Sequence, residues 1–117
     1  MTGVIPNAGL DALRDFVQSE VAELAVGTGT TEPRKTDTDL EAEVFRQGVV
    51  DAAGDTGEVT FTIRLSTADA NGEALAELGA FDGGGDLQAR LTHSSITKTS
   101  DFEIEYRLTE TAVNPYQ

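Results

Sequence analysis

The stretch from Glu77 to Thr109 reads ELGAFDGGGDLQARLTHSSITKTSDFEIEYRLT and decides the fold. Its first part predicts a β-hairpin, because two short apolar runs flank three consecutive glycines that suit a tight turn. Its last part alternates, with apolar residues at even positions from Phe102 to Leu108 and polar residues at odd positions from Glu103 onward. This alternation indicates a strand of an antiparallel sheet with one buried and one solvated face.

Similar patterns extend towards the N-terminus. Residues 59–66 (VTFTIRLS) also alternate, and the loop AGDTGE separates them from the run 44–52, which predicts a second hairpin. Residues 9–24 place apolar side chains at spacings of three and four, as one face of an amphipathic helix does. These apolar residues are Leu10, Leu13, Val17, Val21 and Leu24. We expect this face to pack on the sheet; the alternative is that part of it contacts a neighbouring subunit.

The predicted fold class is therefore α+β: a small antiparallel β-sheet or β-sandwich with one N-terminal amphipathic helix packed against it. A chain of 117 residues suits a single domain. Within it we expect a lead-in arm over 1–8, the helix over 9–24, a short strand over 23–26, a mainly β region over 44–110 and a C-terminal arm over 111–117.

Composition excludes several classes of function. The chain has no cysteine, which rules out disulfides, thiolate metal sites and thiol catalysis. Its 21 acidic and 8 basic residues give a net charge of −13, which disfavours nucleic acid and anionic membranes as partners. Acidic residues dispersed over every segment favour adaptation to high salt, where screening removes their mutual repulsion. The alternative is an acidic surface that meets a basic partner. The N-terminus lacks a signal-peptide pattern, so we expect synthesis in a cytoplasm.

Candidate chemical sites are few. His93 is the only histidine, and an extended segment would point it and Ser94 to opposite faces, against a catalytic pair. Asp82 and Asp86 flank the glycine turn and are the candidates for a hard cation, although a solvated hairpin tip is the simpler interpretation. The GTGT run from Gly27 lacks the lysine of a phosphate-binding loop. No catalytic residue and no cofactor are predicted.

Subunit contacts offer another role for some residues. Glu103, Glu105 and Arg107 line the polar face of the last strand, where Arg107 could pair with an acid of a neighbour or simply face solvent. Lys98 is one of only two lysines and is expected to form a structural salt bridge. The candidates for a subunit interface are Gly27, Gly29, Pro33, Phe81, Lys98, Glu103, Glu105 and Arg107.

The order of several short motifs resembles a family of tail-fibre-like, baseplate-associated structural proteins of tailed viruses. The motifs are LAVGTGTTEP, TDTDLEAEVFR, ELGAFD–GGGDLQARL and KTSDFEIEYRLT, within residues 9–110. The matching positions are Val26 to Gly29, Pro33, Leu40, Glu43, Val44, Arg46, Glu77, Gly79, Phe81, Asp82, Leu87, Arg90, Lys98, Thr99 and Ser100.

This resemblance implies a non-enzymatic virion protein of the tail tip, baseplate or tail-fibre base, which connects subunits for host attachment. It also implies a homo-oligomer, with a trimer as the expected form, and other virion tail proteins as partners. Together with the acidic composition it indicates a virus of halophilic archaea. The alternatives are a capsid decoration or turret protein, a carbohydrate-binding adhesion module and, least supported by the residues, a hydrolase that uses His93 or an acid pair.

Overall fold

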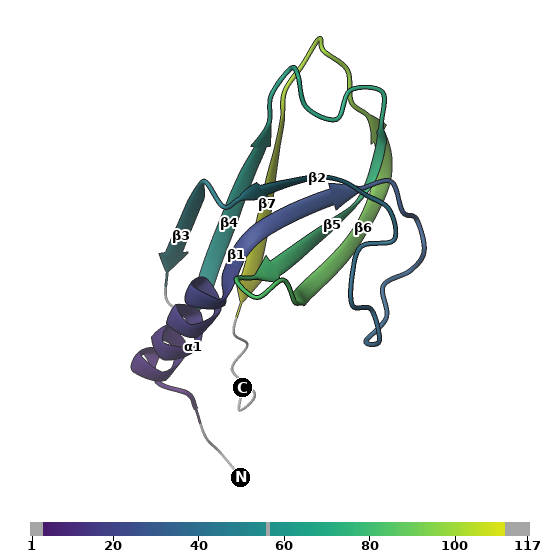
Figure 1. Ribbon diagram of the computed structural model, residues 1–117. Helices are drawn as coiled ribbons and strands as arrows, with labels where there is room; N and C mark the ends of the chain where they lie inside the picture. The colour runs from purple at the N-terminus through teal and green to yellow at the C-terminus, as the bar shows by residue number, and fades with distance from the viewer. Residues whose placement is uncertain (1–3, 56, 112–117) are drawn as a thin grey trace.

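The computed structural model describes residues 4–55 and 57–111, and it contains one helix followed by seven strands (Figure 1). The elements are α1 (Asn7–Glu20), β1 (Val21–Gly27), β2 (Glu43–Gly48), β3 (Asp51–Asp55), β4 (Glu58–Leu65), β5 (Ala74–Asp82), β6 (Leu87–Thr97) and β7 (Ile104–Thr111). Every strand pairing is antiparallel. In the described part of the chain, no helix has the length and hydrophobicity that crossing a membrane requires.

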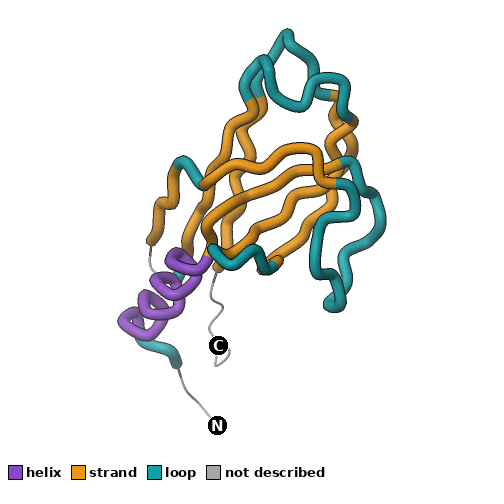
Figure 2. Tube along the Cα trace, viewed as in Figure 1, coloured by secondary structure: helices purple, strands orange, loops and turns teal. Residues whose placement is uncertain are grey.

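The strands form two sheets, one with the order β2-β1-β5-β6 and one with the order β3-β4-β7. Figure 2 shows the two sheets as separate layers, with the helix at one end. One hydrophobic core contains buried side chains from both layers, including Leu24 of β1, Phe61 of β4 and Leu108 of β7. The sheets therefore pack face to face as a small β-sandwich, and the predicted α+β class is confirmed.

The alternation in β4 has the predicted consequence. Its apolar side chains, from Val59 to Leu65, are at most 1% exposed and form one wall of the core. The central strand β5 differs, because every residue from Leu75 to Phe81 is buried on both faces. The inner face of β5 packs on the second sheet, while the segment of residues 28–42 covers its outer face.

The predicted hairpin at the glycine turn is present, since β5 and β6 pair on either side of it. The other predicted hairpin is present only in part: β3 pairs with β4 up to Asp55 and Glu58, so the strand extends into the predicted loop AGDTGE. In the glycine turn Gly85 has a φ of +90°, a conformation that side-chain-bearing residues rarely adopt. The final strand is shorter at its start than predicted: β7 begins at Ile104, and Phe102 precedes it with 38% of its surface exposed.

The helix is shorter than predicted at its C-terminal end. It ends at Glu20, and Val21 continues directly into β1 with an extended backbone. Val21 and Leu24 therefore belong to a strand; the helical spacing of three and four was misleading there because these side chains are buried in the sandwich core. The helix itself lies against β3, β4 and β1, and Gln18 donates a hydrogen bond to the carbonyl of Ala52 over 2.9 Å.

The proposed arms coincide only in part with the structure. Asn7, placed in the lead-in arm, is the first residue of the helix, and Thr111, placed in the C-terminal arm, is the last residue of β7. Residues 112–117, the rest of the predicted C-terminal arm, lie outside the described residues. The run 44–52 is divided between the sheets, because β2 pairs with β1 and β3 pairs with β4.

Candidate functional site

The outer face of the four-stranded sheet carries the most connected polar group of the described structure, the carboxylate of Glu77. Glu77 lies on β5 and pairs in register with Gly27 of β1. Gly79 and Phe81 follow at alternate positions on the same strand, so all three face the 28–42 segment. Glu77 is 0% exposed.

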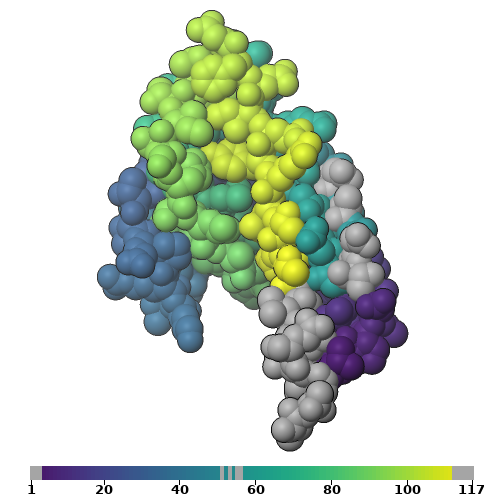
Figure 3. Space-filling view, turned by 180° about the vertical axis from the view of Figure 1, so that it is seen from behind, coloured from purple at the N-terminus to yellow at the C-terminus, as the bar shows by residue number. Residues whose placement is uncertain are grey.

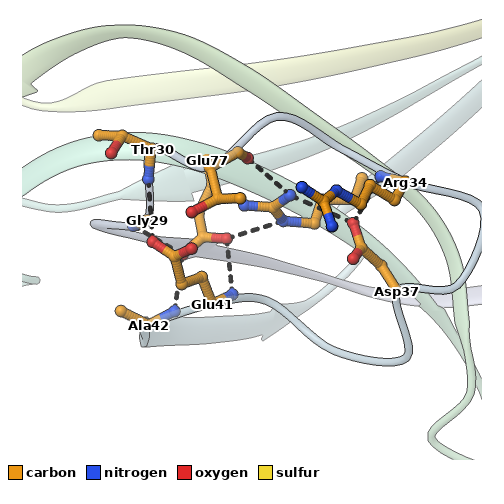
Figure 4. A network of polar contacts seen from close by, with 9 residues as sticks. Gly29, Thr30, Arg34, Asp37, Glu41, Ala42 and Glu77 are labelled. Carbon is orange, nitrogen blue, oxygen red and sulfur yellow. Dashed lines mark hydrogen bonds and ion pairs between the residues drawn. The ribbon is translucent and has the colours of Figure 1, made fainter.

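Four donors surround this carboxylate (Figure 4). The backbone amides of Gly29 and Ala42 each donate to Oε2 over 2.8 Å. The amide of Glu41 donates to Oε1 over 2.9 Å, and Arg90 Nε donates to the same oxygen over 3.0 Å. One side chain therefore fixes both ends of the 28–42 segment, because its amide donors come from positions 29, 41 and 42.

The protonation of Glu77 follows from these contacts. Burial alone would raise the pKa of this carboxyl, since it penalises the charged form. The amides of Glu41, Ala42 and Gly29, together with Arg90, donate to the ionised form and outweigh burial, so the pKa of Glu77 lies below its usual value. Glu77 is ionised at neutral pH and acts as a fixed acceptor.

Arg90 of β6 extends the network to the far end of the loop. Its side chain is 4% exposed; Nη1 donates to the carbonyl of Thr31 over 2.9 Å and contacts Asp37 Oδ2 at 3.2 Å. That oxygen of Asp37 also accepts from the backbone amide of Arg34 over 2.9 Å. Figure 4 places Arg34 and Asp37 on the opposite side of Glu77 from Gly29 and Ala42. Arg90 thus joins the sheet to the tip of the segment.

Three glycines on this face leave the space that the 28–42 segment and the Glu77 carboxylate occupy. A Cβ at Gly29 would lie 2.5 Å from Glu77 Oε2, and one at Gly27 would lie 2.4 Å from the carbonyl oxygen of Ala42. A Cβ at Gly79 would lie 2.7 Å from the side chain of Leu40. Leu40 is the apolar anchor of the loop, and it forms a second small core with Ala25 and Phe81, against which Leu87 packs.

The spacing of Thr38 and Glu41 has the form of a helix-capping pair and predicts a helical turn after Thr38, but the structure has no helix between α1 and β2. Instead the amide of Glu41 bonds to Glu77, and its carboxylate accepts from the amide of Thr30 over 3.3 Å. The glycines of GTGT provide close backbone approach to a carboxylate of this same chain, which agrees with the doubt about a phosphate loop.

Lys98 forms no salt bridge with any described residue, so that prediction is wrong. It is 0% exposed, and its Nζ donates to Asn71 Oδ1 over 3.0 Å and to the carbonyl of Thr99 over 2.9 Å. Its backbone carbonyl also accepts from the amide of Gly72 over 2.8 Å, and its amide donates to the backbone carbonyl of Glu73 over 2.9 Å. Lys98 therefore ties the 66–73 turn to the β6–β7 connection.

The carboxylate of the candidate cation ligand Asp82 has partners in its own hairpin. Oδ1 accepts from the amides of Gly84 and Asp86, each over 2.9 Å, and Oδ2 accepts from Gln88 Nε2 over 3.1 Å. The Asp82 side chain therefore stabilises the glycine turn by accepting hydrogen bonds from its backbone amides, as aspartates commonly do in turns. Over residues 4–55 and 57–111, no group of three or more histidine or acidic side chains is arranged to hold a metal ion.

His93 uses both ring nitrogens within the fold. Nδ1 lies 2.8 Å from the carbonyl oxygen of Ser94, and Nε2 lies 3.0 Å from the hydroxyl of Tyr106. The contact joins β6 of one sheet to β7 of the other. Burial raises the pKa of Tyr106 to about 12, so its hydroxyl keeps its proton at neutral pH. The imidazole therefore bonds to the Ser94 backbone and to Tyr106, and not to the Ser94 hydroxyl.

The predicted interface residues separate into two groups. Gly27, Gly29, Phe81 and Lys98 are buried inside the chain, so the structure gives them an internal role in place of the predicted contact with a neighbour. Pro33 is partly buried, whereas Glu103, Glu105 and Arg107 lie on the outer face of the strand region near β7.

Arg107 already has a partner within the chain. Its Nε lies 2.6 Å from Glu105 Oε1, and Arg64 Nε lies 2.7 Å from the other carboxylate oxygen. These two arginines lower the pKa of Glu105, with the Arg64 bond the larger cause. A contact of this cluster with another subunit stays a prediction.

Sequence reasoning missed the role of Glu77 and Arg90. Both were matched positions of the resemblance, but neither was singled out for its chemistry. The available signal was an acid in the otherwise apolar run LAELGAF, where a central strand rarely carries a charge without a partner. Arg90, on the other strand of the predicted hairpin, was a cation that could supply one.

Comparison of the sequence with protein-family models gives no match, and comparison with curated proteins gives no significant match.

Proposed function

We propose that the chain is a non-enzymatic structural protein of a virion, located in the tail tip, baseplate or tail-fibre base of a tailed virus that infects halophilic archaea. In this role it connects subunits that serve host attachment. It acts as a homo-oligomer, with a trimer as the expected form, and its partners are other tail proteins.

The observation that carries this proposal is where the residues of the resemblance lie in space. Several of these positions, separated by up to 63 residues in the sequence from Gly27 to Arg90, lie on one face of one sheet, whereas Val26 and Val44 pack in the main core and Lys98 lies in the β6–β7 connection. On that face Glu77 and Arg90 hold the 28–42 segment, Leu40 of the segment packs on Phe81, and the guanidinium carbon of Arg46 lies 3.8 Å from the Phe81 ring centroid. The meeting of these distant positions on one face supports the resemblance.

The 28–42 segment, held in place by Glu77 and Arg90, suits a protein that connects subunits rigidly. Charge-assisted hydrogen bonds fix this long loop in place of a helix or strand, and such bonds are roughly twice as strong as neutral ones. The two-layer sandwich also leaves four edge strands, β2 and β6 in one sheet and β3 and β7 in the other. Edge strands offer unpaired backbone groups to a neighbouring chain.

The direct test is the position of the protein in virus particles. Particles from a halophilic archaeal host would be reconstructed by electron cryomicroscopy, and the sandwich with its 28–42 segment would be fitted to the density. We expect the fit in the tail tip, baseplate or fibre base, with rotational symmetry about the tail axis. Density on the capsid would overturn the tail assignment in favour of a decoration or turret role. Absence of the chain from purified particles would overturn the virion assignment altogether.

A second measurement uses the isolated protein at molar salt. Light scattering coupled to size-exclusion chromatography is expected to give a mass of three chains. A glycan array under the same salt separates the proposal from an adhesion module, since saturable binding to a sugar would contradict a purely connecting role.

A further inference from the structure

A polar pocket of about 180 Å³ lies where the tip of the 28–42 segment meets the start of β6. It is lined by Pro33, Arg34, Lys35, Asp37, Leu87, Gln88, Ala89 and Arg90. Three of the eight basic residues of a chain with a net charge of −13 therefore line one pocket. Figure 3 shows this part of the molecule from behind, with the blue segment beside the green strands.

Two of these cations have no ion-pair partner among the described residues. Arg34 and Lys35 are exposed, and neither side chain has a hydrogen bond or ion pair with any residue that the structure describes. The remaining basic side chains all have partners within the chain: Arg14, Arg46, Arg64, Arg90, Lys98 and Arg107. Among the described residues, the unpaired basic side chains are therefore both at the mouth of this pocket.

The third cation is incompletely satisfied. Arg90 is 4% exposed; its Nε and Nη1 bond to Glu77 and to Thr31 with Asp37, but its Nη2 is buried without a hydrogen-bond partner. A buried guanidinium nitrogen without an acceptor is costly, so Arg90 gives the wall of the pocket a positive charge that its partners compensate only in part.

The carboxylates nearby do not cancel this charge. Asp37 Oδ2 is already shared between Arg90 Nη1 and the amide of Arg34, and Glu77 is enclosed by its own four donors. Among the residues that line the pocket, Asp37 is the one carboxylate, whereas Arg34, Lys35 and Arg90 are three cations, so the lining has a surplus of positive charge. Such a surplus favours the presence of an anion at this place.

We propose that this pocket binds an oxyanion, a carboxylate or a phosphate group, through Arg34 and Lys35 at its mouth and Arg90 in its wall. The anion comes either from solution or from an acidic side chain of a second copy of this chain. Binding would hold the tip of the 28–42 segment to β6, because Arg34 and Lys35 belong to the segment and Arg90 to the strand. This inference does not depend on the virion role.

The test follows backbone amide signals of Lys35, Asp37, Gln88 and Arg90 by ¹H–¹⁵N NMR. Sodium acetate and sodium phosphate are titrated separately while sodium chloride keeps the ionic strength constant. We expect saturable shifts at these amides with at least one oxyanion. A parallel series raises the protein concentration without added oxyanion, and shifts of the same amides there would identify the second copy as the source.

The variant is Arg34→Gln with Lys35→Gln, which removes two exposed cations and spares the buried pair. It should fold normally and bind the oxyanion at least about tenfold more weakly, the effect of losing one charge-assisted hydrogen bond. The matched control is Arg64→Gln with Arg107→Gln, which removes the same charge from the Glu105 cluster and should leave binding unchanged. The proposal is overturned if no saturable shift occurs in any series, or if the variant and the control weaken binding equally.

Discussion

Glu77 Oε1 lies 3.0 Å from Arg90 Nε, and the two side chains are only 0% and 4% exposed. The residues belong to the neighbouring strands β5 and β6 but are out of register, because Arg90 pairs with Gly79 and Glu77 pairs with Thr92. Glycine at position 79, between them on β5, leaves room for Leu40 of the 28–42 segment, which a Cβ there would approach to 2.7 Å. This buried ion pair is the anchor on which the conformation of the 28–42 segment depends.

We expect Glu77→Gln to lower the free energy of unfolding by about 3 kcal/mol, because it leaves Arg90 buried without its full counter-charge. Urea denaturation measures the loss, and amide hydrogen exchange at Glu41 and Ala42 should accelerate more than in β4. The control is Glu105→Gln, whose carboxylate pairs with two largely exposed arginines and whose loss should hardly move the midpoint. Equal losses in both variants would contradict an anchoring role of Glu77.

Gly29→Ala tests the close approach of the loop to the carboxylate. The new Cβ would lie 2.5 Å from both Glu77 Oε2 and Glu41 Cβ, so the loop must shift, at a cost of about 1–3 kcal/mol. Gly48→Ala, at the end of β2, is the matched control, since its Cβ would meet no atom within 4 Å. Thermal unfolding of the two variants should differ clearly; a Gly29→Ala protein as stable as the control would show that the loop is not tightly held.

Low pH should reduce the free energy of unfolding, because it protonates the carboxylate of Glu77. Its pKa is lower in the folded state than the usual value of about 4.3, so its stabilising contribution is fully present above that pH and is lost as the pH falls through the lowered value. Unfolding free energies measured from pH 7 down to pH 3 should therefore converge for the native protein and Glu77→Gln. A difference that stays constant over this range would contradict the ionised state of Glu77.

Glu110 should behave in the opposite way. Burial raises its pKa, so the ionised form is disfavoured in the folded state; the stability it contributes is present at acid pH and lost as the pH rises through the raised value. Glu110→Gln should therefore stabilise the protein at pH 7, and this gain should disappear below about pH 4. Glu58→Gln, an exposed acid on β4, should show no such gain. Thermal unfolding at the two pH values measures both effects.

The net charge of −13 predicts that stability rises with salt. The melting temperature should increase steadily from about 0.1 M to several molar potassium chloride, as screening shortens from about 10 Å to below 3 Å and removes repulsion between the acids. Replacing the exposed Glu32, Glu58 and Glu103 with glutamine should flatten this dependence. A flat or falling response of the native protein would indicate instead that the acidity serves a basic partner.

The sequence by itself determined the elements that a short repeat or a tight turn specifies. The alternation in 59–66 and 104–109 follows from a two-residue repeat that places every second side chain towards the core, and three consecutive glycines suit a turn in which Gly85 has a positive φ. The β5–β6 hairpin joins neighbouring segments, so turn chemistry and periodicity were sufficient to predict it; they did not predict that the run 44–52 divides between β2 and β3.

Only the tertiary structure decided what the segments between these elements do. The helix ends at Glu20 because Val21 and Leu24 are needed in the core, and this demand comes from strands far along the chain. Glu77 likewise receives its role from amides 35 to 48 residues away, and Lys98 is buried because the 66–73 turn folds over it. A periodic pattern indicates which side of an element is buried, but which distant group satisfies a buried charge depends on where the chain returns in space.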